Sequence, residues 1–229
     1  MDEHYTVTIE KLVFGGQGLA RLGDVGNIHY DNKTVFVWNA LPGEEVEVEI
    51  IKNKKTYLEA IAINVLKPSP ERIEPTTKNF LSTSSWQILS SERENYWKRA
   101  IAAETYSKIG DLILSANSFE IGYNDIDYGY RNKMEFSFSD RRWYLPQELP
   151  FKEKSDGFAL GLHVPGTYHK VIDMAACLLQ PQTGNDILKE VGQYVKESDV
   201  PVYGLKSHKG FWRYLTIRHS AAFDQWMVN

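Results

Sequence analysis

The first part of the chain alternates between apolar and polar positions with a period of two. Val46, Val48 and Ile50 alternate with glutamates, so one face of this segment is apolar and the other acidic. Three further β-rich runs lie at residues 6–12, 34–38 and 57–63. Strands this short in close succession favour a small closed barrel, because closure removes exposed strand edges. We therefore expect an OB-like β-barrel at residues 1–70.

A glycine-rich segment interrupts these runs at residues 15–18. It lacks the Lys-Ser/Thr pair and the following helix of a phosphate-binding loop. We interpret it as a barrel turn that needs positive φ.

A polar stretch with three prolines follows the barrel segment. Pro68, Pro70 and Pro75 stiffen the backbone and remove hydrogen-bond donors, which indicates a linker. Beyond it, Ser91 and Glu94 have the spacing of a capping box. The apolar face of the helix that follows carries Trp97, Ala100, Ile101 and Ile109, and Gly110 ends it. Residues 71–120 are therefore expected to hold a linker and one helix.

The period of two returns after residue 128. Met134, Phe136 and Phe138 alternate with polar residues, which predicts a strand with one buried face. Further strands are expected at residues 157–163, 170–173 and 214–218, with a helix from about residue 183 to 195. This mixture predicts an α+β domain at residues 121–229. Residues 223–229 resemble a strand just beginning, so we expect this domain to be truncated at its C-terminus and completed by further sequence or by a partner chain.

Composition excludes several classes of protein. The 229 residues include 26 Lys and Arg against 30 Asp and Glu, a formal net charge of −4, so nucleic-acid contact would have to come from local basic patches. Cys177 is the one cysteine, which excludes an internal disulfide and favours a cytoplasmic protein. The sequence begins without a secretory signal and contains no stretch of about 20 apolar residues, so no membrane contact is expected.

Basic residues next to aromatic residues are the candidate binding chemistry. Phosphates attract cations and unpaired bases stack on flat side chains, so such groups suit single-stranded RNA. The candidate RNA-binding residues are Arg131, Lys133, Arg141, Arg142, Lys206, Lys209, Arg213, Arg218, Lys52, Lys54 and Lys55. A solvated turn is the favoured explanation of Lys52, Lys54 and Lys55, and a solvated hairpin explains the group at residues 206–218 as simply as RNA contact does. His163 and His169 lack a third ligand at suitable spacing, so no metal site is predicted.

Several motifs in a fixed order resemble one known family. They are FGGQGLAR at 14–21, VFV at 35–37, LPGE at 41–44, PSPER at 68–72, YRNKMEFSF at 130–138, LGLHVPG at 160–166 and FWRYLTIR at 211–218. Together they resemble the front half of the S-adenosylmethionine-dependent RNA (uracil-5-)-methyltransferases, which make 5-methyluridine in ribosomal and transfer RNA. The resemblance implies that the barrel is a TRAM domain.

The same resemblance implies that the catalytic machinery lies elsewhere. The family's nucleophilic cysteine, its base and its S-adenosylmethionine pocket belong to a Rossmann-like domain, which we expect beyond Asn229. We therefore assign this chain no catalytic residue and no cofactor. Many relatives also hold an iron–sulfur cluster with four cysteines, but residues 75–86 contain none and Cys177 alone matches the fourth position, so we expect no cluster.

These expectations define a function and its alternative. The chain is expected to be the substrate-recognition half of an RNA (uracil-5-)-methyltransferase, inactive alone, whose partners are structured ribosomal or transfer RNA and a C-terminal catalytic domain or partner chain. The alternative is a stand-alone RNA-binding adaptor derived from that family. The downstream reading frame distinguishes the two.

Overall fold

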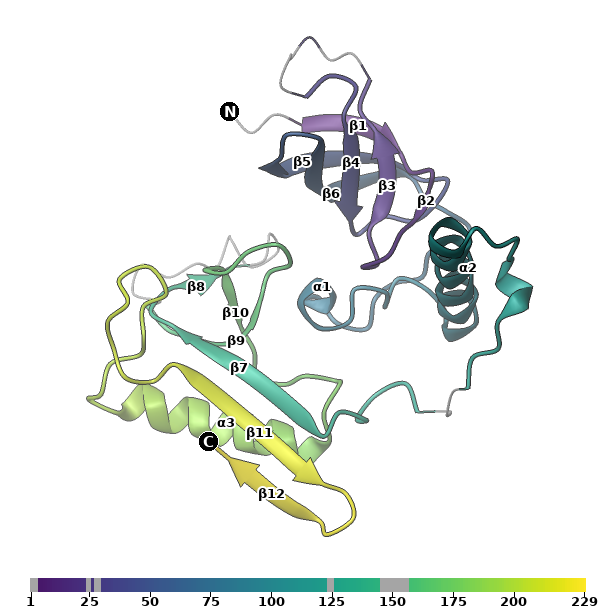
Figure 1. The fold of residues 1–229 in the computed structure, drawn as a ribbon. Coiled ribbons are helices and arrows are strands. Elements are labelled where there is room, and N and C mark those ends of the chain that lie inside the picture. Colours follow the sequence, from purple (N-terminus) through teal and green to yellow (C-terminus); the bar gives the residue numbers. More distant parts are fainter. Residues whose placement is uncertain (1–3, 24–25, 27–29, 123–125, 145–156) are drawn as a thin grey trace. The chain divides into compact units, whose positions relative to one another are not determined.

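A computed structural model describes residues 4–23, 26, 30–122, 126–144 and 157–229 (Figure 1). The chain divides into two compact units. One comprises residues 1–76 and 85–123, and the other comprises residues 77–84 and 124–229. No helix in the described part of the chain is long and apolar enough to cross a membrane.

The first unit is built on a six-stranded sheet in the order β1-β5-β6-β4-β3-β2. Its elements are β1 (His4–Thr8), β2 (Lys11–Leu12), β3 (Gly18–Arg21), β4 (Thr34–Trp38), β5 (Glu45–Asn53), β6 (Tyr57–Lys67), α2 (Ser91–Gly110) and the 3-10 turn η1 (Ala116–Ser118). The strands pair antiparallel except for β4 and β6, which are parallel. Val46 and Val48 are fully buried and share a core with Val35 and Leu58, as the alternation predicts.

The sheet is a half-barrel rather than the closed barrel expected from the strand pattern. The single strand expected at residues 6–12 is divided into β1 and β2, which are the two edges of the sheet. Ile9 and Glu10 lie between them and bond to different parts of the unit: the Ile9 N–H donates to the Glu44 carbonyl, and the Glu10 N–H donates to the Leu19 carbonyl. Residues 4–12 therefore run from one edge of the sheet to the other: β1 pairs with β5, β2 pairs with β3, and β1 and β2 are not paired with each other.

A buried ion pair attaches the segment after β6 to the half-barrel. Both carboxylate oxygens of Glu44, which is fully buried, accept hydrogen bonds from Arg72, at 2.6 Å from Nε and 2.7 Å from Nη2. The N–H groups of Leu41 and Ser69 also donate to this carboxylate, at 2.8 and 3.1 Å. Arg72 further donates to the Asn39 carbonyl at 3.0 Å. The start of the stretch expected to be a linker is therefore bound to the half-barrel through Ser69 and Arg72.

Helix α2 begins one residue earlier than the capping box predicts. Ser90, not Ser91, is the N-cap, and its side chain accepts the Arg93 N–H. With Ser90 as the cap, Arg93 occupies the third helical position, so Glu94 lies one residue too far along for a capping box; it pairs with Lys98 at 2.5 Å. Ile109, expected on the apolar face, is 82% exposed.

The second unit contains a six-stranded sheet in the order β12-β11-β7-β9-β10-β8. Its elements are α1 (Phe80–Thr83), β7 (Lys133–Ser139), β8 (Arg142–Trp143), β9 (Ala159–His163), β10 (Val171–Asp173), α3 (Gln182–Glu197), β11 (Tyr214–Ser220) and β12 (Gln225–Val228). Met134, Phe136 and Phe138 are buried in one core with Leu188 and Val195 of α3, so this helix covers one face of the sheet. The unit is α+β, and β7 and β11 lie side by side along it (Figure 1).

Candidate nucleic-acid interface

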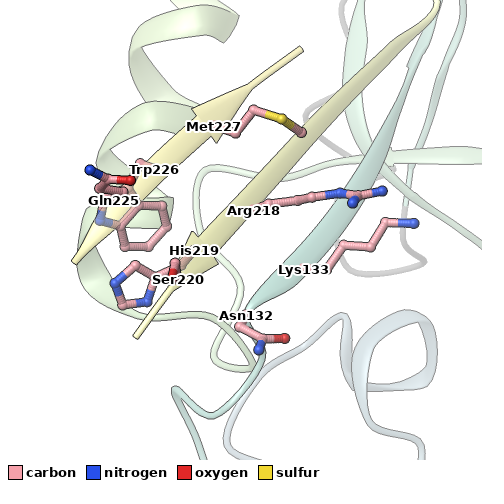
Figure 2. Close-up of a pocket in the computed structure, with 8 residues that line it drawn as sticks. All are labelled: Asn132, Lys133, Arg218, His219, Ser220, Gln225, Trp226 and Met227. Atoms are coloured by element: carbon pink, nitrogen blue, oxygen red, sulfur yellow. The ribbon is translucent and has the colours of Figure 1, made fainter. Parts of the chain in front are cut away.

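Two cations lie directly opposite each other on neighbouring strands. In the antiparallel pair of β7 and β11, Lys133 is the register partner of Arg218. Both side chains are exposed and extend toward the same side of the sheet (Figure 2). Alternation along β7 directs Lys133 away from the buried Met134. This face is therefore the one that α3 does not cover.

The pair is poorly neutralised by the protein itself. Lys133 has Glu135 at 3.7 Å, an exposed ion pair of small energy. No carboxylate in the described part of the chain forms an ion pair with Arg218. Like charges directly opposite on a sheet repel each other, so this arrangement favours an anion placed between or over the two heads.

A hollow at the end of the sheet includes this pair. Its lining residues are Asn132, Lys133, Arg218, His219, Ser220, Gln225, Trp226 and Met227 (Figure 2). His219 and Trp226 stack with ring centroids 4.2 Å apart, and Trp226 packs against the core. His219 directly follows Arg218 on β11, so alternation turns this stack to the other side of the sheet from the two cations (Figure 2). The lining offers two cations, side-chain amides and a hydroxyl, but no carboxylate.

An aromatic side chain lies further along the same strand. Tyr214 is 44% exposed and is the register partner of Ser137. Tyr214 and Arg218 are separated by an even number of positions, so they share a face of β11 and lie about 13 Å apart. Thr216 lies between them, opposite Glu135.

The loop before β11 carries more of the predicted cations. Arg213 places its guanidinium over the ring of Tyr203 at 4.8 Å and over the ring of Tyr214 at 5.1 Å from the centroids. Lys206 and Lys209 are exposed within the same loop. This group and the Lys133–Arg218 pair therefore lie toward opposite ends of β11.

The other predicted cations of this unit do not form one cluster. Arg131 is exposed just before β7 and Arg141 just after it, so the strand, about 20 Å long at the usual rise per residue, separates them. Arg142 serves the fold: its guanidinium lies over Tyr144 at 4.7 Å and approaches Asp173 at 4.0 Å. It is therefore less available to a ligand than its sequence neighbour.

The lysine group of the first unit includes a member that the sequence did not indicate. Lys52 is an ion-pair partner of Glu59 at 3.1 Å, whereas Lys54 and Lys55 are exposed between β5 and β6. Lys33 joins them, because its Nζ donates to the Lys54 carbonyl at 2.9 Å. No local sequence signal links Lys33 to this turn, since the fold alone brings them together.

The histidines and the cysteine occupy structural positions. His163 Nε2 lies 2.8 Å from the hydroxyl of Ser137, and burial, with His169 nearby, lowers the pKa of His163. Burial raises the pKa of the Cys177 thiol, which disfavours the reactive thiolate. In the described ranges no group of three or more His, Cys, Asp or Glu side chains is arranged to hold a metal ion.

S-adenosylmethionine, the cofactor that the resemblance implies, suits neither the Lys133–Arg218 hollow nor a second hollow in the first unit. The Lys133–Arg218 hollow is positively charged and would repel the cofactor's sulfonium, and no carboxylate in it could bind the ribose hydroxyls. The second hollow, in the first unit, is lined mainly by apolar groups from Phe14 to Gly16, Trp86 and α2, and its charged member is Lys98. We therefore derive no chemical step through this cofactor.

The protein consists of a half-barrel followed by an α+β unit, and one sheet face of the second unit carries exposed cations and aromatic rings. Surfaces of this kind are typical of nucleic-acid-binding proteins.

Residues 3–63 match the family model described as TRAM domain. An uncharacterized RNA methyltransferase of Chlorobaculum tepidum is 35% identical over 192 residues, covering 82% of this chain and 40% of that protein. A second, of Bacteroides thetaiotaomicron, is 30% identical over 216 residues, covering 93% of this chain and 46% of that protein.

A solved structure is similar in fold over nearly the whole chain. The crystal structure of Pyrococcus abyssi tRNA (uracil-54, C5)-methyltransferase in complex with S-adenosyl-L-homocysteine matches with a TM-score of 0.63 at 18% identity, covering 97% of this chain and 45% of that one. This chain thus spans somewhat less than half the length of these proteins. The chain belongs to the family of these RNA methyltransferases, as the resemblance implied, and its first unit carries the TRAM domain. The solved structure shows that the fold is shared.

Proposed function

We propose that this chain is the RNA-binding, substrate-recognition part of an S-adenosylmethionine-dependent RNA (uracil-5-)-methyltransferase. The observation that carries the proposal is the Lys133–Arg218 pair, two adjacent and poorly neutralised cations on an exposed sheet face. The TRAM match and the names of the relatives support RNA as the ligand.

The physical basis is phosphate capture combined with base contact. Lys133 and Arg218 bind the backbone of a folded RNA loop, and Arg213 with the lysines of its loop extends the contact along β11. The bound loop is then oriented so that one uridine turns out toward a catalytic domain. We place that domain in the part of the relatives that this chain does not cover.

The proposal assigns binding and orientation to the described residues, and no proton transfer or bond formation. S-adenosylmethionine supplies the methyl group in this family when it is bound, and we assign its pocket to the same catalytic domain. Ribosomal and transfer RNA both belong to the proposed substrate class, and the proposed location is the cytoplasm.

A salt titration tests the proposal. The chain is titrated against loop fragments of ribosomal and transfer RNA at several salt concentrations, with labelled S-adenosylmethionine in parallel. We expect the logarithm of the binding constant to fall linearly with the logarithm of the salt concentration. Replacing Arg131 and Lys133 by alanine should reduce that slope by about 0.7 to 0.9 per lost phosphate contact.

Lys189 provides the matched control. It is an exposed lysine on α3, the helix that covers the opposite face of the sheet, so Lys189→Ala should leave the slope unchanged. Absence of salt-sensitive binding to either RNA would refute the proposal. Methyl transfer by this chain alone would show that the active site has been misplaced.

A further inference from the structure

Tyr214 presents an aromatic ring that its own sheet leaves uncovered. Its cross-strand neighbour Ser137 is buried, and its side chain is too small to cover the ring. Thr216, the next residue on the same face, is also small. Tyr214 is 44% exposed, on the face of β11 that also carries Arg218.

A cation–π contact joins this ring to its neighbours in the chain. The guanidinium of Arg213 lies over both Tyr214 and Tyr203, so the cation links the two rings. The hydroxyl of Tyr203 is in turn 3.0 Å from Nδ1 of His208. Arg213, Tyr203 and His208 thus form a chain of contacts that ends on the Tyr214 ring.

The loop that carries the cluster is itself tightly built. The Tyr203 N–H donates to the Trp212 carbonyl at 2.7 Å, and the Gly204 N–H donates to the Lys209 carbonyl at 2.8 Å. Gly210 has a φ of +120°, and a Cβ there would lie 2.2 Å from the Val202 carbonyl oxygen, so this position requires glycine. A platform held in this way loses little conformational entropy on binding a flat ligand.

We propose that Tyr214 is a stacking platform for one unpaired RNA base. The base lies on the exposed face of the ring, and the backbone continues about 13 Å along β11 to the Lys133–Arg218 pair. Arg213 is a positioning residue that holds the ring. This inference rests on the proposed function and adds to it that the ligand at this position is an unpaired nucleotide rather than a duplex.

The test compares two substitutions that differ in aromaticity. Tyr214→Phe keeps the ring, whereas Tyr214→Leu removes it and keeps an apolar side chain. Against a loop RNA, Tyr214→Phe should bind like the unmodified chain, and Tyr214→Leu should bind roughly fivefold to a hundredfold more weakly. Equal affinity of the two variants would overturn the inference.

A second test changes the RNA instead of the protein. Single abasic positions are introduced through the loop, and we expect one of them to weaken binding to the unmodified chain. The same abasic position should cost nothing further in Tyr214→Leu, because the stacking partner is already missing. Full additivity of the two losses would overturn the inference.

A fluorescent base distinguishes positioning from general weakening. With 2-aminopurine at the sensitive position, stacking on Tyr214 should quench its emission in the saturated complex. Arg213→Met should reduce this quenching at saturation, and Arg213→Lys should restore part of it. If the unmodified chain binds no RNA, the proposed function fails; if it binds RNA with none of these base effects, only the stacking inference fails.

Discussion

Lys133 and Arg218 are register partners in the antiparallel pair of β7 and β11, and both heads are exposed on the same face. Like charges in this relationship destabilise a sheet by a few tenths to about 1 kcal/mol. A fold that keeps such a pair tolerates a small loss of stability in exchange for an anion-binding position.

This relationship predicts opposite effects on stability and on binding. Arg218→Gln should raise the free energy of unfolding by up to about 1 kcal/mol, because it removes the repulsion on Lys133. The same change should weaken RNA binding and lower its salt dependence. Urea denaturation and RNA titration measure the two effects, with Lys189→Gln on α3 as the matched control. A variant that loses stability and keeps its RNA affinity would contradict the account.

The buried Glu44–Arg72 pair predicts a large loss of stability. Arg72→Met should lower the free energy of unfolding by about 3 to 5 kcal/mol, because the Glu44 carboxylate stays buried without its partner. Combining it with Glu44→Gln should recover part of the loss, since no unpaired charge remains. Arg93→Met is the control, because its ion pair with Glu71 is partly exposed and should contribute less. Chemical denaturation measures all three, and similar losses for Arg72→Met and Arg93→Met would argue against the buried pair.

Two neighbouring glycines predict different costs for the same substitution. Gly15 and Gly16 both have positive φ, +96° and +85°, so alanine at either position should cost about 1 to 2 kcal/mol of strain. A Cβ on Gly15 meets nothing within 4 Å, whereas one on Gly16 lies 3.0 Å from Nε1 of Trp86. That indole N–H donates to the Gly16 carbonyl at 2.9 Å, so Gly16→Ala should cost about 1 kcal/mol more than Gly15→Ala. Equal losses in urea denaturation would show that Trp86 yields to the added carbon.

His163 predicts a pH dependence of stability. Burial, with a contribution from His169, lowers the pKa of His163 in the folded protein. The unfolded chain therefore binds a proton at about pH 6.5 that the folded chain does not bind, and stability falls as the pH falls through that value. Replacing His163 by glutamine should flatten the decrease in unfolding free energy between about pH 7.5 and 5.5. His169, whose pKa is also lowered, is the comparison residue, and an unchanged pH profile in His163→Gln would contradict the assignment.

Local patterns were reliable where the signal is itself local. The alternation through Val46 and Val48 and that through Met134, Phe136 and Phe138 both identified buried faces correctly, because the side-chain period of a strand depends only on its own backbone. The turn at residues 15–18 was also correct in needing positive φ. The predicted start of α2 was wrong by one residue, because Ser90 and Ser91 are both suitable N-caps and the spacing from Ser91 to Glu94 favoured the wrong one.

The candidate RNA-binding site was less predictable from the sequence, because it depends on residues from different strands. The sequence placed Arg131 and Lys133 on a polar face but did not pair Lys133 with Arg218, since register joins strands that are distant along the chain. It also missed Tyr214, whose exposure depends on the small residue opposite it.

The amino-acid sequence determined which segments form strands and helices, which faces they bury, and where the basic residues fall along the chain. The tertiary structure decided which of those cations remain available. Lys52 is neutralised by Glu59, and Arg142 is engaged by Tyr144 and Asp173, whereas Arg218 meets no carboxylate among the described residues. An ion pair depends on distances between side chains that folding brings together, and those distances are set by strand register and packing rather than by any spacing in the sequence.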